Sequence, residues 1–246
     1  MRLTVSSRVN IDLDSDHSKQ VWNALSEVSD PELDESVTDM GFVNDVNIDK
    51  HGNVQVGFRL PTFWCAPNFA FLMAQDMHDA IEALPWVNSV KIGLADHCNA
   101  EEINSGIDQG LSFSDTFKGQ AIADLDDLRV SFRRKAFQGR QEVLLRCLRS
   151  LGIKDSDLCG MTMRDLRGLK LKDKASNKLH RRYIEIRGEF GGQTMDNNVA
   201  FPTVAGEPLH IGIFEDYLKE LRSVRVNSEF NANLCRGILD SRYNKK

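Results

Sequence analysis

The sequence lacks the segments that mark secreted and membrane proteins. No run of 18 or more apolar residues occurs, so no helix is expected to span a bilayer. The first eight residues lack the apolar core of a signal peptide. The five cysteines are odd in number, scattered and never spaced as Cys-x-x-Cys. This usage favours a reducing cytoplasm, and it argues against a zinc finger or a ferredoxin-type cluster held by this chain alone.

Signatures of common enzyme classes are also missing. The sequence has no nucleophile elbow, P-loop or dinucleotide fingerprint. The glycine-rich stretch at 188–192 follows an expected strand without an evident helix after it, so it lacks the context of a phosphate cradle. We therefore expect no catalytic constellation, and we predict that the protein is not an enzyme.

Charge is distributed unevenly along the 246 residues, although the formal net charge is only −5. Residues 1–128 contain 7 Lys/Arg and 22 Asp/Glu, whereas residues 129–182 contain 16 Lys/Arg and 5 Asp/Glu. The contrast predicts two units. The basic segment would either dock on the acidic half of the chain or bind a separate acidic partner, and both alternatives stay open.

Hydrophobic periodicity predicts a compact α+β domain at residues 17–96, after a flexible arm at 1–16. Helical spacing and strict alternation succeed one another in the order helix–strand–strand–helix–strand, which is typical of a two-layer sandwich. The expected elements are a helix from 18 to 30, strands at 42–48 and 54–60, a helix at 66–84 and a strand at 90–94.

For the rest of the chain, the sequence predicts a connector at 97–128 and a C-terminal domain at 129–246. The patterns in this domain predict a mixed, mainly helical region with a small sheet. The expected elements are helices at 128–151 and 162–169, strands at 183–186 and 198–202, and a last helix at 213–224.

Cys65 is the most informative single residue. It lies where the second expected strand gives way to a helix that begins at Ala66-Pro67. The unpaired N–H groups and the dipole of a helix N-terminus favour the thiolate, which is both metal ligand and nucleophile. Thr62, three residues earlier, could hydrogen-bond to the sulfur or cap the turn. The alternative is an inert buried cysteine.

Asp30-Pro31-Glu32 places two carboxylates on a constrained turn after the first helix. Carboxylates are suitable oxygen ligands for iron, or partners for a polarised thiol. Taken alone, the same residues favour a simpler interpretation, which is a helix stop with solvated acids.

Three motifs in order resemble a known family. The motifs are Val28-Ser29-Asp30-Pro31-Glu32-Leu33, Thr38-Asp39-Met40-Gly41-Phe42-Val43 and Thr62-Phe63-Trp64-Cys65-Ala66-Pro67. Together they resemble the SufT and PaaD family of metal–sulfur cluster assembly proteins over about residues 17–96. The family pattern has cysteine followed directly by proline, whereas here Ala66 intervenes and shifts the proline by one residue.

The resemblance implies an accessory factor for the assembly or insertion of an iron–sulfur or iron centre in a client protein. It implies that Cys65 is the functional thiol, that Asp30, Glu32 and Thr62 are its neighbours, and that the cargo is a transient iron ion or iron–sulfur cluster. Family members of the phenylacetate pathway accompany a diiron oxygenase. The implied partners are therefore such an oxygenase or its reductase, together with the iron–sulfur assembly machinery.

A second ligand-type cluster follows the third expected strand. His97 and Cys98, with Glu101 or Glu102, would suit iron or zinc. Alternatively Asn99 would cap a short helix with Glu102 reaching back, and we favour this capping interpretation. The remaining cysteines are not expected to be ligands: Cys147, in the expected core, Cys159 and Cys235.

Two other functions stay open. A non-metal-binding adaptor or folding helper would dock on a client through the charge asymmetry and leave Cys65 structural. A nucleic-acid-binding regulator would use the basic segment 129–182. The loop between the two expected helices of that segment is longer than a helix-turn-helix turn, so nucleic acid is not an expected partner.

Overall fold

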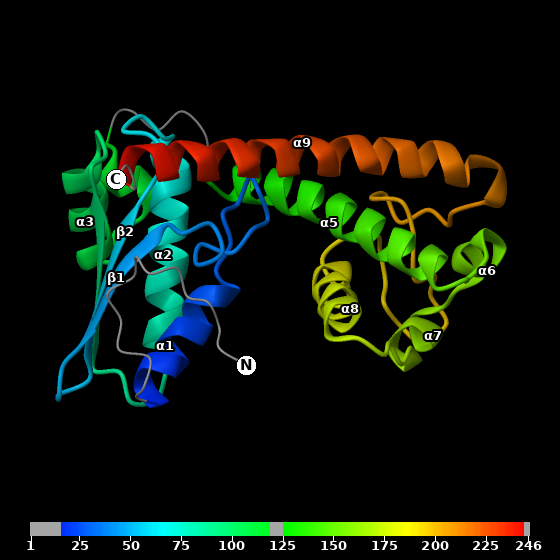
Figure 1. Cartoon of the computed structure of the whole chain (residues 1–246), viewed down its shortest axis with the longest axis horizontal. Coiled ribbons are helices and arrows are strands. Elements are labelled where there is room, and N and C mark those ends of the chain that lie inside the picture. Colours follow the sequence, from blue (N-terminus) through cyan, green and yellow to red (C-terminus); the bar gives the residue numbers. More distant parts are fainter. Residues whose placement is uncertain (1–15, 119–124, 244–246) are drawn as a thin grey trace. The chain divides into compact units, whose positions relative to one another are not determined.

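The computed structural model describes residues 16–118 and 125–243, which form two compact units (Figure 1). Unit 1 comprises the described residues up to 128 together with those from 230 onwards, and unit 2 comprises residues 129–229. The expected arm at 1–16 lies outside the described residues except for Asp16, which begins the first helix. Within the described ranges, no helix combines the length and the hydropathy needed to cross a membrane.

Unit 1 has the helix–strand–strand–helix–strand order predicted from periodicity, and the α+β fold class is confirmed. Two further short helices and the end of a long last helix, α9, complete the unit. The elements are α1 (Asp16–Glu27), β1 (Val43–Ile48), β2 (Asn53–Arg59), α2 (Pro67–Glu82), β3 (Ser89–Ala95), α3 (Ala100–Asp108), α4 (Phe113–Thr116) and the last turns of α9 (Ile211–Tyr243).

The sheet of unit 1 is mixed, and its central strand leads into the segment that contains Cys65. Strand β2 pairs antiparallel with β1 and parallel with β3. The Asp49 carboxylate closes the β1–β2 hairpin by accepting hydrogen bonds from the N–H groups of His51 and Asn53, at 2.8 and 2.9 Å. A parallel pair needs a crossover, which α2 supplies. The chain therefore enters α2 just beyond the carboxyl end of β2.

The core of unit 1 extends beyond the predicted sandwich. Its interior includes Leu25 of α1, Phe58 of β2 and Met77 of α2. Ile103 of α3, in the segment expected to be a connector, and Leu239 of α9 belong to the same core. Residues far outside the first 96 thus help to hold the domain together.

Unit 2 is helical, and the small sheet expected at 129–246 is wrong for the described residues. Its elements are α5 (Leu125–Ser150, from Arg129), α6 (Asp155–Gly160), α7 (Met163–Gly168), α8 (Lys174–Arg187) and the first part of α9. The strand expected at 183–186 lies within α8, where Tyr183 and Ile186 are both buried at a helical i, i+3 spacing. The strand expected at 198–202 contributes only isolated bridges, Thr162 to Val199 and Pro202 to Pro208.

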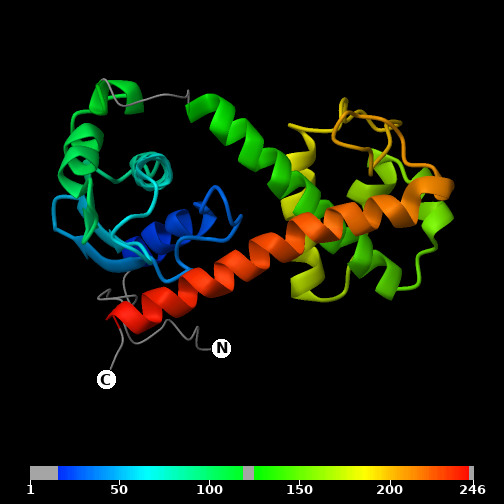
Figure 2. The ribbon, with the colours of Figure 1, turned by 90° about the horizontal axis from the view of Figure 1, so that it is seen from above.

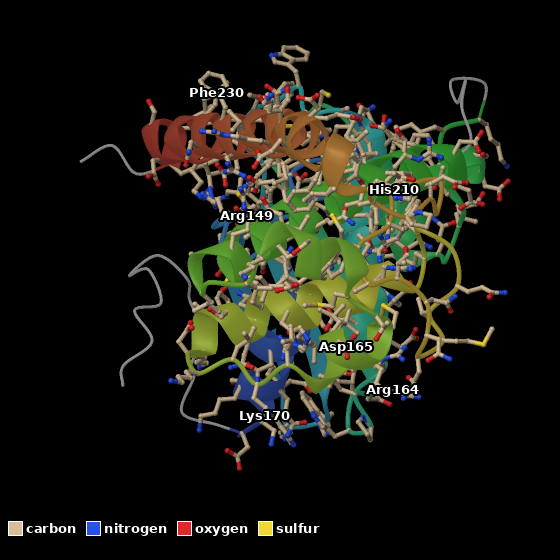
Figure 3. All side chains as sticks on the ribbon, turned by 90° about the vertical axis from the view of Figure 1, so that its right-hand side faces the viewer. Arg149, Arg164, Asp165, Lys170, His210 and Phe230 are labelled. Carbon is tan, nitrogen blue, oxygen red and sulfur yellow. The ribbon has the colours of Figure 1, made fainter. Side chains whose placement is uncertain are left out.

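Part of the positive charge of the basic segment is paired inside unit 2. Arg149 lies 2.9 Å from Asp155 and 2.6 Å from Glu215, and Arg164 lies 3.4 Å from Asp196. Arg149 and Arg164 are labelled on the face of unit 2 shown in Figure 3. Such exposed pairs each contribute about 0–1 kcal/mol. These pairs neutralise part of the positive charge of the basic segment with carboxylates of unit 2 itself.

A buried guanidinium organises the loop after α8. Arg187 is fully buried, and burial lowers the pKa of its guanidinium. The guanidinium donates hydrogen bonds of 2.9 to 3.3 Å to the carbonyl oxygens of Phe190, Gly192, Gln193, Val199 and Ala200. The glycine-rich stretch at 188–192 follows a helix, not the expected strand. Two of its carbonyl oxygens accept hydrogen bonds from the Arg187 guanidinium. The stretch therefore binds a cationic side chain and does not present N–H groups to a phosphate.

We expect Arg187→Met to destabilise unit 2 by about 3 kcal/mol or more, because it leaves several buried carbonyl oxygens without a donor. Urea unfolding followed by circular dichroism measures the change. The matched control is Arg181→Met on the same helix, where an exposed i, i+4 pair with Glu185 is lost and the effect should stay within about 0.5 kcal/mol. Equal effects of the two substitutions would contradict the role assigned to Arg187.

Candidate functional site

Cys65 lies beyond the carboxyl end of the central strand, in the turn that leads into α2. Helix α2 begins at Pro67, and Ala66 takes the N-cap position without a side-chain cap. The inserted alanine therefore moves the thiol one residue further from the helix than a Cys-Pro junction would. The predicted contact with Thr62 is present, because its Oγ1 lies 3.2 Å from the Cys65 Sγ. The thiol is half-buried.

His97 fixes the backbone of this turn. It follows β3, and because β2 and β3 are parallel, the residues beyond their carboxyl ends lie at the same edge of the sheet. The Nδ1 of His97 accepts from the N–H of Asn99 at 3.1 Å, so Nε2 carries the proton and donates to the Cys65 carbonyl at 2.7 Å. Both ring nitrogens of this buried side chain are thus engaged in backbone contacts.

The expected capping interaction of the 97–102 segment is wrong. Asn99 occupies the N-cap position of α3 but makes no side-chain cap hydrogen bond. Its Oδ1 instead accepts from the exposed thiol of Cys98 at 3.3 Å. The predicted metal role of His97 and Cys98 stays a prediction, and the geometry assigns His97 a different task, which is to hold the Cys65 carbonyl.

Asp30 is a buried carboxylate at the head of the Asp-Pro-Glu turn. Its Oδ1 accepts from the N–H groups of Glu32 and Leu33, both at 2.9 Å, and only 7% of the residue is exposed. Burial raises the pKa of Asp30 to about 6; the two N–H donors oppose this shift and the neighbouring Glu32 charge adds to it. A helix stop with solvated acids therefore does not describe Asp30.

Cys235, from the end of α9, also belongs to this region, although it is absent from the site predicted from the sequence. Burial raises the pKa of this half-buried thiol to about 11, and the charges of Asp30, Cys65 and Glu32 raise it further. These are three of the residues assigned to the site by the family resemblance. The helical spacing of Ala232, Cys235 and Leu239 indicates a buried face, but no local pattern says what that face contacts.

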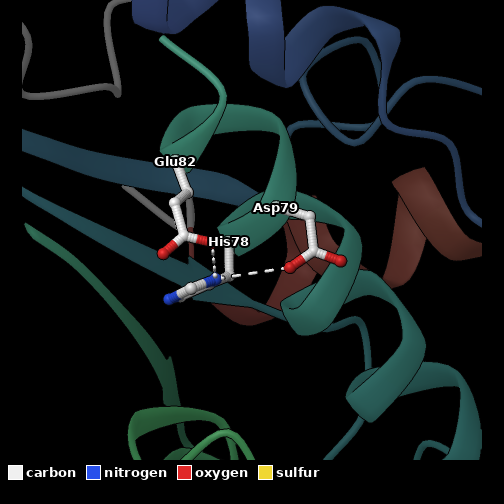
Figure 4. A group of neighbouring side chains, drawn as sticks. All are labelled: His78, Asp79 and Glu82. Atoms are coloured by element: carbon white, nitrogen blue, oxygen red, sulfur yellow. Dashed lines mark hydrogen bonds and ion pairs between the residues drawn. The ribbon is translucent and has the colours of Figure 1, made fainter. Parts of the chain in front are cut away.

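A different group meets the geometry of a metal site more closely among the described residues. His78 Nδ1 lies 3.4 Å from Asp79 Oδ1 and 3.9 Å from Glu82 Oε2, and the ligand atoms of all three lie within 4.8 Å of one another (Figure 4). The first of them, His78, lies on α2 eleven residues after Pro67, roughly 16 Å along the helix, and the other two lie further along. Both carboxylates are exposed, and the set is an ordinary helix-surface ion pair distant from Cys65.

Fold and site together describe an α+β domain with a half-buried thiol in the turn before α2 and a buried carboxylate at the head of the Asp-Pro-Glu turn. A family model described as "Iron-sulfur cluster assembly protein" matches residues 18–92. A protein of Methanocaldococcus jannaschii, described as uncharacterized, is 33% identical over 86 residues, which are 35% of this chain and 88% of the relative. No solved structure matches the chain. The chain belongs, through this domain, to the SufT- and PaaD-like iron–sulfur assembly family.

The raised pKa of Asp30 makes the stability of unit 1 depend on pH. The folded pKa, about 6, exceeds the ordinary value of 3.8, so the folded domain keeps a proton that the unfolded chain releases between these values. The stability that this proton contributes is therefore fully present below 3.8 and is lost as pH rises through about 6. Asp30→Asn keeps the Oδ1 acceptor but does not titrate.

We expect the stability of Asp30→Asn relative to wild type to increase by up to about 3 kcal/mol between about pH 4 and pH 7. Urea unfolding of both proteins across this range measures the difference. Glu101→Gln, which neutralises an exposed carboxylate in the first turn of α3, is the matched control and should show little trend. A pH-independent difference for Asp30→Asn would show that folding does not raise the pKa of this carboxyl group.

Proposed function

We propose that this protein is an accessory factor that holds or relays iron, sulfide or a small cluster for insertion into a client protein. One observation carries the proposal. In a domain of the iron–sulfur assembly family, the half-buried Cys65 thiol lies in the turn before α2 and contacts Thr62 Oγ1 at 3.2 Å. A thiolate, with the carboxylates of Asp30 and Glu32 that the family resemblance assigns to the site, is a ligand set that suits iron. Partial burial limits access of solvent to the cargo, and partial exposure allows transfer.

We propose a carrier and not a catalyst. A catalytic cysteine needs a base positioned at its sulfur. His97 is in contact with Cys65, but it donates to the carbonyl oxygen and leaves the thiol to Thr62. The arrangement orients the sulfur without preparing it to attack a substrate. The client proposed from the family resemblance is a diiron oxygenase or its reductase.

Replacement of the thiol tests this proposal. Cys65→Ser keeps a hydroxyl in reach of Thr62 and removes the soft ligand. Delivery of iron or cluster to the client should fall by more than the ~10–100-fold typical of lost outer-shell partners. The measurement is anaerobic reconstitution with iron and sulfide, followed by metal analysis and client activity. Cys159→Ser, at a free thiol of unit 2 that is not expected to be a ligand, is the control and should leave iron binding and delivery unchanged. Undiminished client maturation with Cys65→Ser would favour the adaptor function instead.

An exposed aromatic pair marks where the client would approach. Phe63 and Trp64 are 38% and 76% exposed and pack edge to face, with ring centroids 4.9 Å apart. They immediately precede Cys65, and cargo transfer requires that the client reach this thiol. Large exposed aromatic side chains are typical anchors of protein interfaces.

We expect Trp64→Ala to separate cargo binding from delivery. Iron bound per chain should not change, because the indole is not a ligand, whereas binding to the client should weaken by about 2 kcal/mol. Calorimetry with the purified client measures the affinity. Met195→Ala, at a side chain of similar exposure (64%) in unit 2, is the matched control. Unchanged client affinity for Trp64→Ala would remove this face from the interface.

A further inference from the structure

The loop that follows β3 is joined to the turn that contains Cys65 by two hydrogen bonds. The Nε2 of His97 donates to the Cys65 carbonyl at 2.7 Å. The N–H of the next residue, Cys98, donates to the Phe63 carbonyl at 3.0 Å. The two acceptors flank Trp64, so the loop is bonded on both sides of the residue that precedes Cys65. The position of the Cys65 backbone therefore depends on the position of this loop.

The direction of the His97 side chain is fixed at both ring nitrogens. The residue is only 5% exposed, and its Nδ1 accepts from the Asn99 N–H at 3.1 Å. Because Nδ1 is an acceptor, the neutral ring carries its proton on Nε2, which is the nitrogen that donates to Cys65. The imidazole thus acts on the backbone of Cys65 and makes no printed contact with its sulfur.

Asp96, the residue before His97, has a backbone conformation that requires support. Its φ is 56°, in the left-handed region that a residue with a Cβ adopts uncommonly, although aspartate tolerates it better than most. Strand β3 ends at Ala95, so the chain changes direction at this residue. The conformation of Asp96 therefore determines where the next residue, His97, is placed.

The last residues of α9 bind Asp96 through three contacts. Arg242 Nη2 lies 2.7 Å from the Asp96 carboxylate and donates to the Asp96 carbonyl at 3.2 Å. The Tyr243 hydroxyl donates to the same carboxylate at 2.7 Å. Arg242 also approaches the carbonyl of Leu60, just beyond the end of β2, at 3.5 Å. In Figures 1 and 2 the red end of α9 runs along unit 1, as these contacts require.

We propose that His97 is the positioning residue of the Cys65 thiol, and that the end of α9 keeps His97 in place through Asp96. His97 acts through the Cys65 carbonyl and not as a ligand. The consequence for cargo rests on the proposed function: the held turn keeps the thiol half-buried beside Thr62, where bound cargo is shielded from solvent. Asp96, His97 and the end of α9 all lie outside residues 18–92, which the family model matches.

Alkylation of the full chain with iodoacetamide, in the absence of metal, tests this assignment, and mass spectrometry reads each cysteine separately. His97→Asn keeps an acceptor for the Asn99 N–H, but its shorter side chain does not reach the Cys65 carbonyl. We expect Cys65 to react faster by about fivefold or more, because the loss of one buried hydrogen bond shifts a local opening equilibrium by roughly that factor.

Cys235 is the internal control, because it is also half-buried in unit 1 and reports any loosening of the whole unit. It should keep its wild-type rate in His97→Asn. An equal acceleration of Cys65 and Cys235 would mean that His97 only stabilises unit 1, and it would overturn the proposal. An unchanged rate of Cys65 would overturn it as well.

His97→Gln is the rescue variant. Its amide nitrogen extends about as far as the imidazole Nε2 and can donate to the same carbonyl. The reaction rate of Cys65 should therefore return close to that of wild type. A rate equal to that of His97→Asn would show that the donated hydrogen bond does not position the thiol, and it would contradict the proposal.

Arg242→Met tests the part assigned to α9. The substitution removes the ion pair with Asp96, and we expect Cys65 to react faster by about twofold or more, as the loss of a partly exposed ion pair allows. Arg222→Met, at an exposed arginine of the same helix within unit 2, is the matched control and should leave the rate unchanged. A wild-type rate in Arg242→Met would overturn the role of the helix end.

Iron binding separates this proposal from the proposed function, because the alkylation rates involve neither iron nor a client. If both hold, iron bound per chain after anaerobic reconstitution should fall in His97→Asn and recover in His97→Gln. The expected alkylation rates in a chain whose wild type binds no iron would reject the carrier and support the positioning role. Iron binding that is lost in Cys65→Ser, with an unchanged Cys65 rate in His97→Asn, would reject the positioning role and keep the carrier.

Discussion

The buried carboxylate of Asp30 is the constraint on which the rest of the site depends. Two N–H donors hold its Oδ1, and Pro31 restricts the backbone between them. The Asp30 N–H also donates a hydrogen bond to the Glu35 carbonyl, which closes the turn. This bond fixes the backbone of Glu35, whose carboxylate pairs with Arg236. A buried acid with a raised pKa is costly to ionise, and such costs are concentrated at functional positions.

The sequence predicts unit 1 well because its signals are local. Alternation in Val54, Val56 and Phe58 marks a half-buried strand, and the burial along β2 follows it. The Thr62–Cys65 contact was also predictable, since both residues lie within one turn. The family resemblance added roles to these residues, and the matched region confirms the family.

Contacts between distant segments could not be predicted in the same way. Nothing within a few residues of His97 indicates that its imidazole binds the carbonyl of Cys65, 32 positions away. Cys235 is even more distant from Cys65 along the chain. The spacing of apolar residues around it indicates a buried helix face, but it does not indicate which segment that face packs against. At Tyr183 and Ile186, short apolar runs fit both a strand and a helix, and packing in unit 2 decided for the helix.

Helix α9 adds to the core of the family domain from outside the residues that the family model matches, 18–92. The relative from Methanocaldococcus jannaschii aligns with this chain over 88% of its own length, which leaves little room for a counterpart of α9. In this chain, Ala232 and Leu239 of α9 belong to the core of unit 1. Helix α9 also contributes Phe214 and Leu221 to the core of unit 2, so that one continuous helix supplies apolar side chains to the cores of both units.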